Sequence, residues 1–148
     1  RGRDMKPERA ERLMREGLLK SVSPDIAKAR SLMISAEKTA SYAAALQVTE
    51  NSATVIFREL YESLRMLGEA RLCLLGYSTD SHEAQLEALE DYCPAANMRL
   101  TYLNRFREIR HKANYYGNLV EPERAKEIIA FWTSHGKDFL EKLKTKVR

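Results

Sequence analysis

A dense group of cationic and hydrogen-bonding side chains lies between residues 105 and 117 of this 148-residue chain. It includes three arginines, a histidine, an asparagine and two tyrosines, and a glycine ends it. At the helical period, Arg107, Arg110 and Asn114 lie within roughly 60° of one another. The apolar side of the same helix is formed by Phe106, Ile109 and Ala113. Arginine grips phosphate oxygens and histidine transfers protons near neutral pH, so the stretch predicts a packed helix with an anion-binding stripe.

Other familiar kinds of enzyme site find little support in the sequence. It contains no GxSxG, HExxH, DxD or Walker pattern. Cys73 and Cys93 stand far apart, without a CxxC pattern or a nearby pair of histidines, so a zinc site is not expected. The remaining chemistry needs neither a metal nor a cofactor. It is the binding of phosphate and, with a suitable base, metal-independent cleavage of RNA.

Composition and charge agree with a polyanionic partner. The formal net charge is +4, and basic residues at the two ends of the chain account for much of the excess. Two thiols in a core of this size indicate a reducing compartment. The sequence has no apolar run of about 18 residues, and it starts with charged residues. We therefore expect a cytoplasmic protein that neither enters a membrane nor is secreted.

Helical periodicity through most of the chain predicts the elements that position this group. Residues 6–20 predict a short, charged helix. Ser23, followed by a proline and an aspartate, predicts the start of a long helix that reaches about Leu46. Asn51 is the expected cap of the next long helix, and Gly76 is expected to end it.

A short inserted helix and the helix of the polar group come next. Asp80 opens a capping-box pattern, which predicts a short helix from Ser81 to Tyr92. His82 is attributed to that cap. The helix that carries the polar group is expected from about Ala96 to Tyr116.

The last helix is predicted to start at Glu121, with Gly136 weakening its middle. No stretch shows the alternation of a strand. The predicted fold is all-α: an antiparallel up-down four-helix bundle with a short inserted helix and a charged N-terminal helix. Residues 1–22 would form the charged N-terminal segment and residues 23–148 the bundle domain.

A regular series of charges follows one side of the second long helix. Arg58, Glu62, Arg65 and Glu69 recur at steps of four, three and four residues. Three interpretations stay open: a solvated face, a set of groups that orients a neighbouring polar site, or a contact between subunits.

The residues from Arg110 to Gly117, RHKANYYG, resemble the signature end of a HEPN domain, the higher eukaryotes and prokaryotes nucleotide-binding domain. The segments Phe57–Arg65 and Ser81–Ala84 resemble a prokaryotic, especially archaeal, branch of that family. The likeness covers roughly Pro24 to Lys144 and leaves the charged N-terminal segment outside.

The resemblance implies a helical bundle that commonly dimerises, with the arginine motifs of both subunits at a shared cleft. Many relatives are RNases, and these are often toxins encoded beside a minimal nucleotidyltransferase antitoxin. Others have lost activity and bind RNA or nucleotides. The family's catalytic pattern is an arginine, usually a polar neighbour, four to six further positions and a histidine.

Two registers place that pattern on this chain. In the first, Arg110 is the family arginine and His111 its polar neighbour, which leaves Tyr115 where the histidine is expected. In the second, Arg105 and His111 satisfy the literal spacing. We prefer the first, because the residues after Tyr115 also match and because Arg105 and His111 lie about 120° apart around a helix.

The leading hypothesis is a HEPN-like homodimer that binds RNA or a nucleotide in this cleft. The alternatives are a metal-independent RNase toxin, with an arginine stabilising the phosphorane-like charge and His111 shuttling protons, and a noncatalytic helical protein-interaction module. Tyrosine is a poorer base than histidine at neutral pH, which argues against full activity.

The expected catalytic residues are Arg110, His111 and Tyr115. The expected RNA- or phosphate-binding residues are Arg107, Asn114 and Tyr116, with support from Arg58, Glu62 and Arg65. For the two tyrosines, base stacking and core packing are equally favoured.

Overall fold

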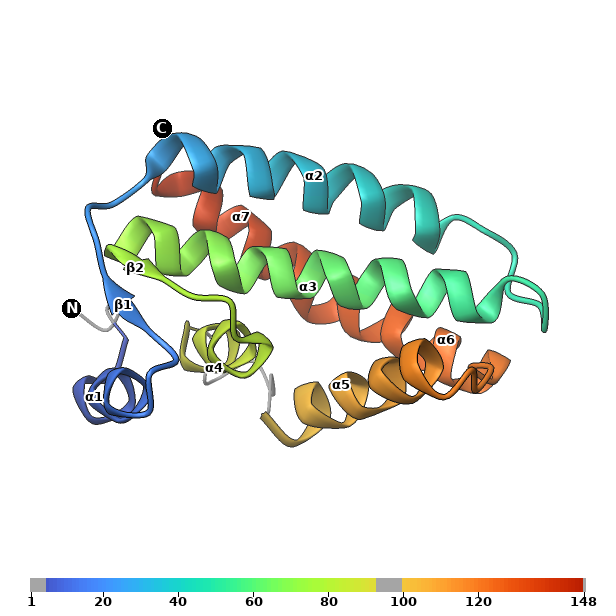
Figure 1. Cartoon of the computed structure of the whole chain (residues 1–148). Helices are drawn as coiled ribbons and strands as arrows, with labels where there is room; N and C mark the ends of the chain where they lie inside the picture. Colours follow the sequence, from blue (N-terminus) through green and yellow to red (C-terminus); the bar gives the residue numbers. More distant parts are fainter. Residues whose placement is uncertain (1–4, 93–99, 148) are drawn as a thin grey trace.

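The computed structural model of the chain describes residues 5–92 and 100–147, and its fold is all-α, as predicted. Four long rods run alternately in opposite directions, and α3 lies among the other three (Figure 1). These rods are α2 (Ile26–Ala44), α3 (Ala53–Leu75), α5 (Leu100–Tyr115) and the continuous pair α6 (Pro122–Phe131) and α7 (Lys137–Thr145). The predicted start of the α5 helix at Ala96, like Cys93, lies outside the described residues.

Helix α2 starts at a different cap from the predicted one. The side chain of Asp25, not that of Ser23, accepts the backbone N–H of Lys28 at 2.9 Å. The tertiary structure explains the shift, because the chain before α2 is fastened to the end of α3. The backbone N–H of Asp25 donates to the carbonyl of Cys73 at 3.0 Å, and Asp25 itself has non-helical backbone angles, with φ of −122° and ψ of 88°.

The start of α3 also differs from the prediction, whereas its end agrees. Ser52 occupies the N-cap position in place of Asn51, and its hydroxyl caps no helical N–H. That hydroxyl instead donates to the carbonyl of Gln47 at 2.6 Å and accepts the N–H of Thr49 at 2.9 Å, which closes the preceding loop. Gly76 ends the helix in the left-handed region, with φ of 87°, as predicted.

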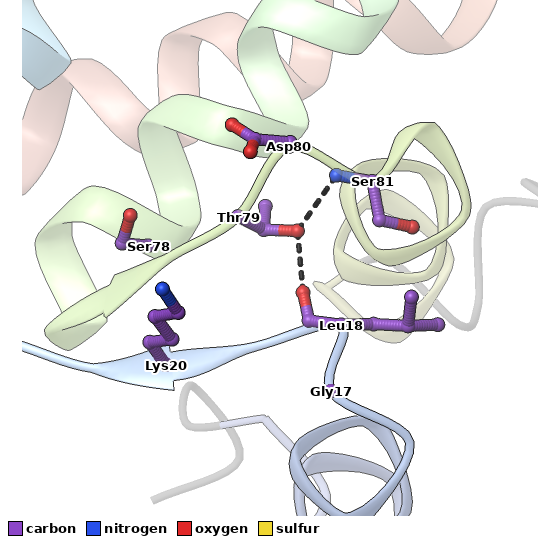
Figure 2. Close-up of a pocket in the computed structure, with 7 residues that line it drawn as sticks. All are labelled: Gly17, Leu18, Lys20, Ser78, Thr79, Asp80 and Ser81. Carbon is purple, nitrogen blue, oxygen red and sulfur yellow. Dashed lines mark hydrogen bonds between the residues drawn. The ribbon is translucent and has the colours of Figure 1, made fainter.

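The inserted helix α4 (His82–Tyr92) is capped one residue later than the predicted Asp80. Ser81 accepts the N–H of Ala84 at 3.2 Å. Thr79 sets this position, because its hydroxyl accepts the N–H of Ser81 at 2.9 Å and donates to the carbonyl of Leu18 (Figure 2). The start of α4 is thereby fixed by a contact with the N-terminal segment.

The sequence predicted no strands, and this prediction is wrong, because the structure contains two short ones. β1 (Lys20–Ser21) pairs antiparallel with β2 (Tyr77–Ser78), and the two lie beside the shallow pocket of about 280 Å³ in Figure 2. Each strand has two residues, which is too short to leave an alternating pattern in the sequence.

The N-terminal segment packs on the bundle through α1 (Pro7–Arg15). Its buried side chains share a hydrophobic cluster with α3 and α4; the cluster contains Met5, Ala10, Leu13, Leu19, Leu72, Ala84 and Ala88. Arg9 and Arg12 add ion pairs to Glu87, which is only 3% exposed. This segment therefore covers the side of α4 that faces away from α5 (Figure 1).

A π turn interrupts the last helix where Gly136 was expected to weaken it. The turn covers Trp132–Gly136 and joins α6 to α7. A Cβ atom on Gly136 would lie 2.3 Å from a carbon of the buried Trp132 ring. The glycine is thus required by indole packing. Within the described residues, every helix is too short or too polar to cross a bilayer.

Candidate nucleic-acid interface

A wide groove of about 1230 Å³ lies where α5 passes the start of α4 and the middle of α3. Helix α5 supplies one long wall, and the opposite side comes from one residue of α3 and two residues around the start of α4. The groove is lined by Tyr61, Asp80, His82, Asn104, Arg105, Arg107, Glu108, Arg110, His111, Lys112, Tyr115 and Tyr116.

The α5 wall carries an excess of positive charge. Arg107, Arg110 and Lys112 all line it, and among the described residues no carboxylate forms an ion pair with any of them. Arg105 differs, because it pairs with Glu127 of α6. The groove also contains the carboxylates of Asp80 and Glu108, so these three cations outnumber the two anions. Such a surface attracts an anion.

Tyr61 and His82 form a buried polar pair at the back of the groove. Tyr61 is fully buried, and its hydroxyl lies 3.1 Å from Nδ1 of His82. Burial raises the pKa of Tyr61 to about 12, so the phenol stays protonated at neutral pH. The guanidinium of Arg110 lies 5.7 Å from the centre of the tyrosine ring, within range of a cation–π interaction.

The environment of His82 favours its neutral form. Burial lowers the pKa of this imidazole below its ordinary value, and the charges of Arg65 and Arg110 lower it further. Its Nδ1 is engaged by Tyr61, and the ring lines the groove, so the other ring nitrogen is the one available to a bound molecule. His82 therefore does more than the helix cap to which the sequence assigned it, and Ser81 performs the capping.

We expect this lowered pKa to appear in the stability of the protein. The unfolded chain, whose imidazole pKa is about 6.5, binds the proton more tightly than the folded chain, so acidification favours unfolding. The contribution of neutral His82 is complete above about pH 6.5 and is lost as the pH falls below it. As the pH is lowered from about 7.5 to about 5, the unfolding temperature of the wild type should therefore fall more steeply than that of His82→Asn. Equal slopes would contradict this assignment, and His135→Asn is the matched control.

Within the charge series, Arg65 and Glu69 are largely buried, whereas Arg58 is exposed. Arg65 donates to Glu62, to Glu69 at 3.2 Å and to the amide oxygen of Gln85 on α4 at 3.0 Å. Its side chain is only 15% exposed. Burial by itself raises the pKa of Glu62, but hydrogen bonding to Arg65 and its charge outweigh burial, so the pKa lies below its usual value. The series thus supports the back of the groove and holds α4 against α3.

Arg58 lies at the other end of the series and contacts α5. Its guanidinium donates to the backbone carbonyl of Ala113 at 3.4 Å, a long hydrogen bond. Arg58, Glu62 and Arg65 do not line the groove. Their contacts agree with the interpretation in which the charge series orients a neighbouring polar site.

Three exposed rings gather at the C-terminal end of the α5 wall. The centre of the His111 ring lies 4.6 Å from that of Tyr115 and 6.0 Å from that of Tyr116. Tyr115 and Tyr116 are 69% and 72% exposed, which rules out core packing for both. Gly117 then turns the chain with φ of 69°. These rings are free to stack on a base.

The remaining predicted residue, Asn114, is exposed on α5 and is not among the groove-lining residues. The structure therefore brings together five of the six predicted catalytic and binding residues: Arg107, Arg110, His111, Tyr115 and Tyr116. All five come from one helix and its end.

Sequence reasoning missed Tyr61 and His82. A tyrosine on the buried face of a long helix needs a hydrogen-bond partner for its hydroxyl, and this is the sequence feature that could have pointed to Tyr61. Nothing in the sequence identified the partner, which lies on another helix 21 residues away.

The groove also contains Glu108 and His111, whose spacing on α5 is that of the ExxH pattern found in some metal sites. The described residues contain no group of three or more His, Cys, Asp or Glu side chains placed to hold a metal ion.

Comparison of the chain with family models, curated proteins and solved structures found no match.

Proposed function

We propose that this chain is a HEPN-like protein that binds RNA or a nucleotide in the groove between α5 and α4. One observation supports it above the others: three cations that pair with no carboxylate of residues 5–92 or 100–147, Arg107, Arg110 and Lys112, line one wall of a groove large enough for nucleotides. Guanidinium groups donate paired hydrogen bonds to phosphate oxygens, so the wall suits a phosphate backbone.

The exposed rings favour a nucleic acid over a small inorganic anion. Tyr115 and Tyr116 stand at the end of the cationic wall, where they can stack on bases while the arginines hold the phosphates. Base stacking tolerates any sequence, because every base has an aromatic face. The proposed ligand is therefore a nucleotide or an RNA segment with accessible bases.

The proposal includes a homodimer in which the two grooves meet, as the resemblance implies. Beyond the end of α5, Leu119 is 80% exposed and follows the two exposed tyrosines in the sequence, and exposed large side chains of this kind suit a subunit contact. On the resemblance, we also propose a minimal nucleotidyltransferase antitoxin as the partner protein and a role in a toxin–antitoxin pair.

Salt dependence tests RNA binding directly. With phosphate contacts from two or three groove cations, the affinity for a fluorescent, mixed-sequence, single-stranded RNA should fall steeply between about 50 and 200 mM salt. Each contact contributes a slope of about −0.7 in a plot of log affinity against log salt, so a slope between about −1.4 and about −2.1 is expected. No binding, or a flat slope, would contradict the proposal. Either result would favour the noncatalytic protein-interaction module.

A second candidate, the metal-independent RNase, is favoured by the pair Tyr61 and His82. A neutral imidazole beside two arginines supplies the base that Tyr115 does not, and arginines suit the negative charge that develops on phosphorus. In this candidate Arg110 keeps its expected role at the phosphate.

A further inference from the structure

We propose that His82, oriented by Tyr61, is the catalytic base of this groove and that His111 belongs to the RNA-contacting wall. This inference rests on the proposed function, because it requires RNA in the groove. It differs from the sequence prediction, which gave the proton transfer to His111.

The surroundings of the two histidines distinguish them. His111 is exposed on α5, and its ring contacts are with two exposed tyrosines. His82 lies deeper, and the buried phenol of Tyr61 holds its Nδ1 at 3.1 Å. A base must be held in one orientation to accept a proton efficiently, and His82 meets this requirement.

The phenol allows His82 to act as a base. A tyrosine hydroxyl both donates and accepts, so it can stabilise either tautomer of the neutral ring. When it accepts the Nδ1–H, the lone pair of Nε2 is available to the groove. After protonation, the imidazolium still donates from Nδ1 to the phenolic oxygen, so no hydrogen bond is lost.

The charges around His82 keep it neutral before the reaction. The groups that act on it are Glu62 and Arg65 of α3 and Arg107 and Arg110 of α5, together with the phenol of Tyr61; Asp80 lies on its own segment and lines the same groove. Burial lowers the pKa of His82 most, and the arginines, which outweigh Glu62, lower it further. The imidazole is therefore unprotonated at neutral pH, as a base must be.

The proposed reaction transfers a phosphoryl group within the RNA. Nε2 of His82 takes the proton of a 2′-hydroxyl while the 2′-oxygen forms a bond to phosphorus and the bond from phosphorus to the 5′-oxygen breaks. The departing 5′-oxygen takes a proton from water, and the imidazolium then returns its proton to the resulting hydroxide. The products are a 2′,3′-cyclic phosphate and a 5′-hydroxyl. Arg107 and Arg110 stabilise the charge on the phosphoryl oxygens.

The test uses the full chain, a pool of mixed-sequence single-stranded RNA and EDTA, and replaces each of the three histidines by asparagine. Affinity is measured separately on single-stranded DNA of the same sequences, which lacks the 2′-hydroxyl. His82→Asn should lower kcat at least about 100-fold with nearly unchanged affinity, because a general base contributes about that much. His111→Asn should mainly raise KM. His135→Asn should change neither, because His135 packs against Phe131 and is not among the residues that line the groove.

Two further measurements keep the proposal testable if His82→Asn does not fold. The wild-type rate should fall on acidification, with its midpoint below about pH 6.5, because the base must be neutral. Tyr61→Phe should change the position of that midpoint, whereas a purely structural loss would lower the rate equally at every pH. A rate that rises on acidification would overturn the proposal.

The outcomes separate the two proposals. Binding without cleavage by the wild type, or loss of kcat in His111→Asn but not in His82→Asn, overturns the role of His82 and leaves RNA binding intact. Absence of binding to both nucleic acids overturns the proposed function, and the role of His82 with it.

Discussion

Replacing Arg107 and Arg110 together by alanine should weaken RNA binding about 100-fold at moderate salt. A hydrogen bond to a charged group contributes roughly 1.5 to 3 kcal/mol, so two of them amount to at least about 3 kcal/mol. Every 1.4 kcal/mol is about tenfold in affinity. Both side chains line the groove without a carboxylate partner in the described part of the chain, so their loss removes phosphate contacts and breaks no ion pair.

Salt titration of this double variant identifies the mechanism. Loss of two phosphate contacts should reduce the slope of log affinity against log salt by about 1.4 for a single strand. Arg15→Ala combined with Lys38→Ala removes the same charge from exposed positions on α1 and α2 and should change affinity little. Equal weakening by both pairs would show that only the overall charge attracts RNA and that the groove has no special role.

Gly68→Ala should destabilise the fold by about 3 kcal/mol, although the same change in an exposed helix stabilises by about 1 kcal/mol. A Cβ atom at this position would lie 2.0 Å from the backbone carbonyl oxygen of Gln85. Because the obstacle is backbone, α4 would have to move away from α3 as a whole. That movement would also shift His82, at the start of α4, away from Tyr61.

Urea unfolding measures the free-energy change, and the pH dependence of unfolding reports whether His82 keeps its environment. Gly17→Ala is the matched control. It lies in the left-handed region, with φ of 76°, and nothing lies within 4 Å of an added Cβ, so only the backbone strain of about 1 kcal/mol is expected. A Gly68→Ala variant as stable as the wild type would contradict the close crossing of α3 and α4.

Contacts with α3 and α1 fix the position of α4, so the crossing of α3 and α4 also positions the site. Arg65 contacts Gln85, and the buried Arg71 donates to the carbonyl of Ala88 at 2.8 Å. On the other side, Arg9 and Arg12 of α1 pair with Glu87. A short helix of 11 residues would be marginal alone, and these contacts from two sides fix the position of His82.

The helices themselves could be predicted from the sequence because their signal is local. Apolar residues that recur at helical spacing mark the face that packs, and this placed α2, α3 and the last helix within a few residues. The predicted α5 wall also depends on one helix alone. Its arginines, His111 and the two tyrosines share a surface whatever lies opposite, provided that the helix forms.

Tertiary contacts decided the helix starts. Asp25 caps α2 because the preceding segment bonds to the end of α3, and Ser81 caps α4 because Thr79 bonds to Leu18. Ser23 and Asp80 are equally good caps by residue type. Which of the possible N-cap residues is used depends on where hydrogen bonds from a distant part of the chain fix the backbone before the helix.

The sequence by itself determined an all-α chain and a cationic, aromatic helix that closes at Gly117. Only the tertiary structure placed Tyr61 against His82, opposite that helix, and turned the charge series of α3 into the support of α4. Periodicity reports which side of a helix is buried, but it carries no information about which partner a buried hydroxyl or guanidinium meets. The partners here come from separate helices, and the packing of α4 between α1 and α3 brings them together.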